Sequence, residues 1–144
     1  AVAKLKVSLD VPLTPEQTWE HASDLSGYDR WLSIHEAWRG ELPEQLAVGT
    51  TLDSVASVKG MRNRVSWKIE SYDPPKKLEL KGNGKGGVKI GLNMSVKAKG
   101  DGSEITIDVN LGGAPLFGPI GSGVARALKG DIENSLKTFV KIYA

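Results

Sequence analysis

The feature that most constrains this chain is an apolar periodicity over residues 116–143. Apolar side chains recur there in steps of four, which places them on one face of an α-helix. They are Leu116, Ile120, Val124, Leu128, Ile132, Leu136 and Val140. Such a helix would be about 40 Å long at ~1.5 Å per residue. Because it cannot bury this stripe by itself, the rest of the chain must supply a broad apolar surface.

The opposite side of the predicted helix is charged. It carries Arg126, Lys129, Glu133, Lys137 and Lys141. A helix with one apolar and one charged face lies at the surface of a core, with its charges in solvent. We therefore expect the helix to cover the core and not to pass through it.

The preceding residues predict the surface on which this helix lies. Most of them alternate between apolar and polar side chains, as half-buried strands do. Strands are predicted at residues 2–11, 34–39, 50–59, 64–72, 77–81, 88–99 and 104–111. Turns are predicted at 60–63, 82–87 and 100–102, with a longer connection at 40–49.

Two short helices are predicted after the first strand, at residues 15–23 and 26–32. Thr14 and Gln17 have the spacing of a capping box, and Pro15 fits the first helical position. Trp19 and Ala22 are the expected inward residues of the first helix, and Trp31 and Leu32 those of the second.

These elements define a fold class. Short connections between successive strands imply an antiparallel sheet, and a sheet with one apolar face needs one cover. We predict an α+β fold in which a curved seven-stranded antiparallel sheet wraps around the long C-terminal helix. The 144 residues suit a single domain, 1–144.

Composition excludes several classes of function. Nineteen basic and 17 acidic residues give a net charge of +2 and are interleaved, which argues against a nucleic-acid partner. The chain has no cysteine and two histidines, so we expect no metal and no cofactor. No apolar run approaches the ~18 residues that span a bilayer. We expect no stable membrane insertion and a cytoplasmic protein, provided that no leader precedes Ala1.

This order of elements resembles the START-like, helix-grip superfamily, which includes polyketide cyclase/dehydrase and lipid transport proteins. Segments 31–35, 59–64, 82–88 and 112–121 are similar to a mycobacterial group in which some members are labelled toxins of toxin–antitoxin pairs. The resemblance implies a hydrophobic small-molecule ligand held between the helix and the sheet. For the toxin-labelled members it implies an antitoxin partner, whose identity is unknown.

The inward side chains provide the candidate ligand-binding residues. Taken alone they favour a fully packed core, whereas the resemblance favours a cavity, and ligand cavities typically measure about 300–1,000 Å³. The candidates are Trp38, Ser54, Asn63, Trp67, Ile69, Leu80, Met94, Val96, Ile107, Phe117, Ile120, Val124 and Leu128.

His35 and Glu36 are the candidate catalytic residues. Strict alternation places Glu36 on the same face as Trp38, so burial of Trp38 would draw Glu36 inward and leave His35 at the strand's entrance. Either side chain could transfer protons or, with Arg39, orient a ligand. His35 would equally serve to fix the local turn.

Two glycine-rich segments allow alternative interpretations. Gly82, Gly84 and Gly87 match a dinucleotide-binding pattern, but a strand follows where that chemistry needs a helix, which favours a hairpin turn. Residues 112–123 could form a flexible gate or allow close packing. Pro119 suggests that the regular helix begins there.

The leading hypothesis is binding or carriage of a hydrophobic small molecule, such as a lipid, a polyketide or an aromatic metabolite. The first alternative is an enzyme, a polyketide cyclase or dehydratase that uses His35 or Glu36. The second alternative is a toxin of a toxin–antitoxin pair that acts through protein interaction.

Overall fold

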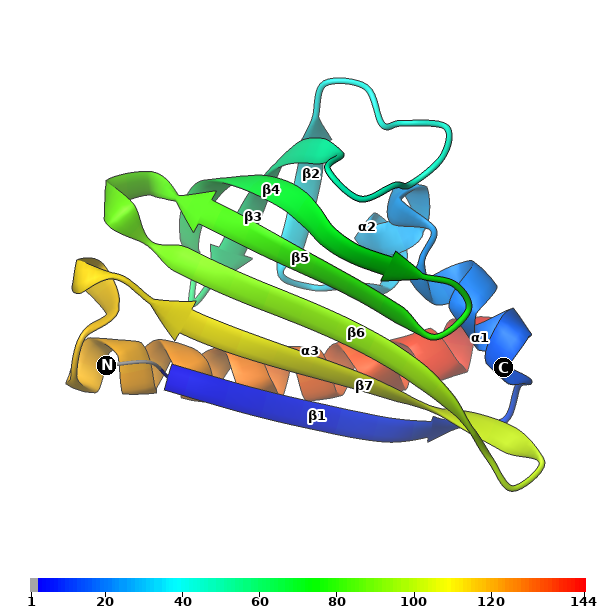
Figure 1. The fold of residues 1–144 in the computed structure, drawn as a ribbon. Coiled ribbons are helices and arrows are strands. Elements are labelled where there is room, and N and C mark those ends of the chain that lie inside the picture. The colour runs from blue at the N-terminus through cyan, green and yellow to red at the C-terminus, as the bar shows by residue number, and fades with distance from the viewer. Residues whose placement is uncertain (1–2) are drawn as a thin grey trace.

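A curled sheet and a long helix dominate the computed structural model, which describes residues 3–144 (Figure 1). The predicted α+β order is confirmed, and Val2, in the first predicted strand, lies outside the described residues. The elements are β1 (Ala3–Val11), α1 (Pro15–Ala22), η1 (Leu25–Gly27), α2 (Tyr28–Trp31), β2 (His35–Arg39), β3 (Thr51–Val58), β4 (Met61–Asp73), β5 (Lys77–Gly84), η2 (Lys85–Gly87), β6 (Lys89–Lys99), β7 (Gly102–Gly112), η3 (Ala114–Leu116) and α3 (Pro119–Tyr143).

The seven strands form one antiparallel sheet in the order β1-β7-β6-β5-β4-β3-β2. The pairing of β1 with β7 places the N-terminal strand beside α3, which runs behind these strands in Figure 1. The register aligns apolar side chains across strands: Val7 opposes Ile107, and Met94 opposes both Ile107 and Leu78. Because side chains alternate along a strand, these residues share the concave face that α3 covers.

Helix α3 buries the predicted face over most of its length. Leu128, Ile132, Leu136 and Phe139 are buried, and the predicted charged residues are exposed. At the start of the helix the prediction is wrong, because Ile120 is 64% exposed and Gly121 is buried instead.

The reason for this rotation is the packing of Gly121. A Cβ at this position would lie 1.9 Å from the carbonyl oxygen of Leu116, an approach that only glycine permits. With Gly121 turned toward the chain that precedes the helix, Ile120 faces solvent. Close packing therefore explains this glycine, whereas Gly123 has open space around it.

Two predicted turns are displaced in the structure. The β3–β4 turn is the pair Lys59 and Gly60, both with positive φ angles of 55° and 75°, and not residues 60–63. Consecutive positive φ angles suit a two-residue hairpin, so β4 begins at Met61. Strand β5 continues to Gly84, and η2 makes the turn before β6. Gly82 is required in β5 because a Cβ there would lie 2.7 Å from the Trp67 ring.

The short helices are fixed to the sheet and to α3 by buried hydrogen bonds. The capping box predicted at the start of α1 is present, with Thr14 and Gln17 bonding each other's backbone. The hydroxyl of Thr18 lies 2.7 Å from that of Ser103 on β7. The Ser135 hydroxyl of α3 accepts a hydrogen bond from the backbone N–H of Ser33, after α2.

The glycines of α3 provide a matched stability test. Gly130→Ala should raise the free energy of unfolding by about 0.5–1 kcal/mol, because nothing lies within 4 Å of the added Cβ and alanine favours the helix. Gly121→Ala should lower it, because the backbone at Leu116 must move. Urea unfolding of both variants measures the difference, and equal effects would contradict the close packing of Gly121.

Candidate functional site

A small apolar cavity of about 20 Å³ lies between the helices and the sheet. Its walls come from α2 and the residue after it, from β5, β6 and β7, and from the middle of α3. The lining residues are Tyr28, Trp31, Leu32, Leu78, Leu80, Leu92, Met94, Ile107 and Ile132. This volume is about that needed for one water molecule, but a site without polar partners stays dry.

One residue that lines the cavity carries a buried polar group without a partner. Trp31 is buried, and its indole N–H has no hydrogen-bond partner; among residues 3–144 it is the only buried side-chain nitrogen or oxygen atom in that state. Burying an unpaired donor costs roughly 1–3 kcal/mol. The fold therefore carries a buried donor that the described residues leave unsatisfied.

Aromatic packing explains why the cavity is far smaller than the several hundred Å³ expected for a ligand site. Trp31 lies edge-on to Phe139 of α3, with ring centroids 5.1 Å apart, and to Tyr28 at 5.4 Å. These rings from α2 and α3 occupy space that the resemblance had assigned to a ligand. The sequence interpretation had placed Trp31 in the core but had not brought Tyr28 to the same place.

The predicted ligand-binding residues fall into distinct places. Three of them line the cavity, Leu80, Met94 and Ile107. Three more, Ile69, Val96 and Leu128, are buried in the surrounding core. Phe117 and Ile120 were predicted as walls but are 55% and 64% exposed, because η3 and the first turn of α3 lie at the surface.

The remaining candidates lie toward β2–β4 and the start of α3. Trp38, Trp67 and Val124 are half-buried. Ser54 is buried and accepts a hydrogen bond of 2.8 Å from the indole N–H of Trp67. The Asn63 side-chain oxygen accepts from the backbone N–H of Lys85, which fixes the η2 turn. The polar groups of Ser54 and Asn63 thus already have partners within the chain.

Six of the lining residues were not predicted, namely Tyr28, Trp31, Leu32, Leu78, Leu92 and Ile132. Leu78, Leu92 and Ile132 belonged to the predicted apolar faces, so the alternation and the helical stripe contained the signal for them. Tyr28 had no such signal, because it belongs to a single helical turn.

The predicted inward position of Glu36 is wrong. A register shift between His35 and Ala37 interrupts the alternation of β2, so His35 opposes Ala56 while Trp38 opposes Ser54. Both therefore point to the concave side, with ring centroids 4.6 Å apart. Glu36 points outward instead and pairs with Arg62 at 2.9 Å.

His35 lies in an aromatic cluster and not on the cavity wall. It packs against Trp38 and, edge-on, against Tyr28. Burial lowers the pKa of His35, and the nearby Asp29 carboxylate opposes that shift. Tyr28 is the one titratable residue among those lining the cavity; its hydroxyl donates to the Ala22 carbonyl, and burial followed by the charge of Asp24 raises its pKa.

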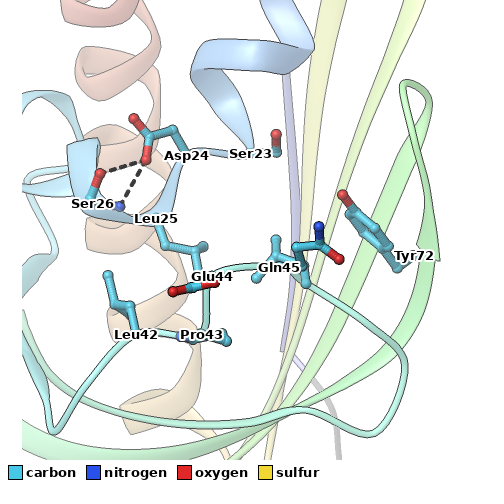
Figure 2. A pocket seen from close by; sticks show the side chains of 10 residues that line it. Ser23, Asp24, Leu25, Ser26, Leu42, Pro43, Glu44, Gln45 and Tyr72 are labelled. Atoms are coloured by element: carbon cyan, nitrogen blue, oxygen red, sulfur yellow. Dashed lines mark hydrogen bonds between the residues drawn. The ribbon is translucent and has the colours of Figure 1, made fainter.

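A second hollow lies at the surface between the β2–β3 loop and the α1–η1 connection (Figure 2). It measures about 580 Å³, and its apolar lining includes Leu25, Leu42 and Leu46, with the ring of Tyr72. The Asp24 carboxylate there accepts hydrogen bonds from the backbone N–H and the hydroxyl of Ser26. Asp24 thus caps η1, and the acidic groups of this hollow do not form a site for an apolar ligand.

The lowered pKa of His35 predicts a pH dependence of stability. The folded state disfavours the imidazolium, so unfolding should become easier as the pH falls from the unfolded pKa of about 6.5 toward the folded value. His35→Gln should reduce the fall in Tm between about pH 7.5 and 5.5. The control is His21→Gln, which removes the other imidazole. If His21→Gln, and not His35→Gln, reduced the fall in Tm, the assignment of the pH dependence to His35 would be contradicted.

Comparison with known proteins agrees with this architecture. Residues 2–143 match the sequence model of a family described as polyketide cyclase / dehydrase and lipid transport. The chain is 52% identical over 143 residues to a Mycobacterium tuberculosis protein named Toxin Rv0910 and 48% identical over 142 residues to its Uncharacterized protein Rv1546. Each alignment covers 99% of both chains.

A solved START superfamily protein from Mycobacterium smegmatis has the same fold. Its TM-score is 0.79 at 15% identity, and the match covers 98% of this chain and 99% of that one. Among residues 3–144, none of the helices is both long enough and apolar enough to cross a membrane. The match of the family model to residues 2–143 shows that this chain belongs to the polyketide cyclase / dehydrase and lipid transport family.

Proposed function

We propose that the protein binds a hydrophobic small molecule that carries an oxygen acceptor, between α3 and the concave face of the sheet. The observation that carries the proposal is the unpartnered indole N–H of Trp31, a residue of the cavity wall. All other lining side chains except Tyr28 are hydrocarbon or thioether, and the hydroxyl of Tyr28 is already bonded. Membership of a family that includes lipid transport supports the same class of ligand.

The ligand must enlarge the cavity, because 20 Å³ holds no lipid, polyketide or aromatic metabolite. We place the movement at η3 and the first turns of α3, where Phe117 and Ile120 are exposed and therefore contribute little packing. Gly118 and Gly123 have open space around them. Displacement of this segment would expose the part of Val124 that is now buried. It would also open a path inward toward Leu128.

Two opposing terms set the affinity. Apolar burial contributes about 25 cal/mol per Å² of ligand surface, and opening the packed core opposes it. A hydrogen bond from Trp31 to a ligand oxygen would add roughly 0.5–1.5 kcal/mol, or about two- to tenfold in Kd. Ligands with an oxygen at the right place should therefore bind more tightly than their hydrocarbon analogues.

A matched ligand pair tests the role of Trp31. The probes are 2-acetylnaphthalene and 2-ethylnaphthalene, which differ in a carbonyl oxygen. The ketone should bind the wild-type chain about two- to tenfold more tightly, and Trp31→Phe should abolish that preference because it removes the donor. Titration by intrinsic fluorescence and thermal shift measures both. Equal weakening of both probes, or no binding of either, would contradict the proposal.

The cyclase or dehydratase alternative lacks a supporting geometry. His35 faces the aromatic cluster, Glu36 faces solvent with Arg62, and the Tyr28 hydroxyl is bonded to Ala22. Proton transfer requires a titratable group within hydrogen-bond reach of the substrate. We therefore assign no catalytic role to these residues.

A toxin role is the second candidate function, and the 52% identity to the protein named Toxin Rv0910 over 99% of both chains favours it. We expect induced expression of this chain in a mycobacterial host to slow growth, measured as optical density against an empty-vector control. Ile132→Asp, which places a charge in the core, should unfold the chain and restore growth. Unchanged growth at confirmed expression of the folded chain would contradict this role.

A further inference from the structure

The outer face of the sheet carries an excess of positive charge at one end. We define the basic strip as the outward side chains of β2 and β3, of β4 from Met61 to Lys68, and of the adjoining residues 81–85. Its basic members are all exposed, and they are Arg39, Arg62, Arg64, Lys68, Lys81 and Lys85. Its two carboxylates are Glu36 and Asp53. With six basic and two acidic groups the strip carries +4, so the rest of the chain, whose total is +2, carries −2.

Cations in the basic strip face one another across strands. Lys68 on β4 lies directly opposite Lys81 on β5. The same register pairs Val65 with Gly84, so Arg64 comes next to Lys85 at the end of this ladder. Like charges that oppose one another on a sheet destabilise it. An anion bound over these residues would relieve the repulsion.

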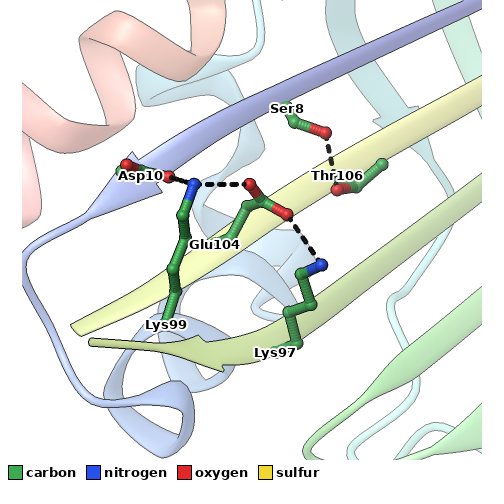
Figure 3. Close-up of polar contacts among 6 residues, drawn as sticks. All are labelled: Ser8, Asp10, Lys97, Lys99, Glu104 and Thr106. Carbon is green, nitrogen blue, oxygen red and sulfur yellow. Dashed lines mark hydrogen bonds and ion pairs between the residues drawn. The ribbon is translucent and has the colours of Figure 1, made fainter. Parts of the chain in front are cut away.

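At the other end of the same face, on β1, β6 and β7, the lysines are paired with carboxylates (Figure 3). Lys99 lies 2.8 Å from Asp10 and 3.1 Å from Glu104, and Lys97 pairs with Glu104 at 3.3 Å. Hydrogen bonds from Lys99 and Lys97 lower the pKa of Glu104. Within the basic strip, Arg62 alone has an ion pair among the described residues, with Glu36.

The basic strip is also hollowed. A groove of about 770 Å³ opens on it, lined by Arg39, Val55, Arg62, Asn63, Arg64, Asn83, Gly84 and Lys85. Guanidinium groups bind carboxylates through two parallel hydrogen bonds, and three of the four cations of this groove are arginines.

We propose that the basic strip binds an acidic segment of a partner protein. Carboxylates in an extended segment would reach Arg39, Arg64 and Lys85 along the groove and the Lys68–Lys81 pair beyond it. A single-stranded nucleic acid would call for aromatic stacking platforms, and the groove has no aromatic lining residue. A narrow polypeptide segment can enter a groove, whereas the flat surface of an anionic membrane would span it.

The basic strip lies on the outer face of the sheet, so binding there does not depend on a ligand in the interior. The side chains of β4 alternate, so Arg64 and Lys68 point outward while Val65 and Ile69 are buried. Substitutions in the strip therefore leave the cavity walls in place. The proposal of a cavity ligand can be contradicted while the proposal of an acidic partner is supported, or the reverse.

The test measures binding of a fluorescein-labelled poly-glutamate peptide by fluorescence anisotropy at near-physiological salt. Arg64→Glu combined with Lys81→Glu should weaken binding about tenfold or more. The control is Lys129→Glu with Lys137→Glu, which changes the net charge by the same amount on the exposed face of α3 and should leave the affinity within about twofold of wild type.

A second variant separates folding from binding. Lys68→Glu converts the Lys68–Lys81 repulsion into an attraction, so it should raise Tm while it weakens peptide binding. A lowered Tm would overturn the assignment of repulsion at this pair. The proposed partner class would be overturned if a poly-uridine oligomer or phosphatidylglycerol vesicles bound as tightly as poly-glutamate or more tightly. It would also be overturned if the α3 control variant weakened peptide binding as much as the strip variant does.

Discussion

The burial of one face of α3 on the concave side of the sheet is the interaction on which the rest of the structure depends. Ile132, Leu136 and Phe139 have no exposed surface, and each contributes roughly 1.5–3 kcal/mol by leaving water. The strands opposite them could not remain half-apolar in water without this cover. The helix in turn has no other surface on which to place its stripe.

This arrangement makes the interior almost wholly apolar. Each polar group inside it therefore needs a hydrogen-bond partner, because an unpaired one would destabilise the fold. Ser54 is bonded to Trp67, Thr18 to Ser103, and Tyr28 to the Ala22 carbonyl. Trp31 differs from them because its N–H has no partner among the described residues. A buried donor of this kind costs stability unless something else accepts from it. This cost is the reason for proposing a ligand that carries an oxygen acceptor.

Much of the fold could be predicted because local rules and tertiary packing agree. Alternation predicted the strands, and the four-residue steps predicted α3, since a strand or helix with one buried face must repeat at its own period. The errors lie where tertiary contacts override a local rule. The close approach of Gly121 to Leu116 rotates the start of α3 and exposes Ile120. The irregularity between His35 and Ala37 turns His35 inward and Glu36 outward, whereas Trp38 keeps its predicted face.

The candidate site was less predictable for a related reason. The apolar faces identified Leu80, Met94 and Ile107 as inward residues, but no local pattern shows how far side chains from α2 reach into the space between them. Three rings from two elements, Tyr28 and Trp31 of α2 and Phe139 of α3, pack against one another beside this space, and the cavity that is left measures about 20 Å³. Packing of this kind depends on distances between elements far apart in the chain.

The same alternation that builds the core also gives the sheet two chemically different faces. Along β4, the inward and outward side chains alternate. Val65, Trp67 and Ile69 point inward, and Arg64 and Lys68 point outward. An apolar ligand and an anionic partner would thus contact opposite faces without sharing a side chain.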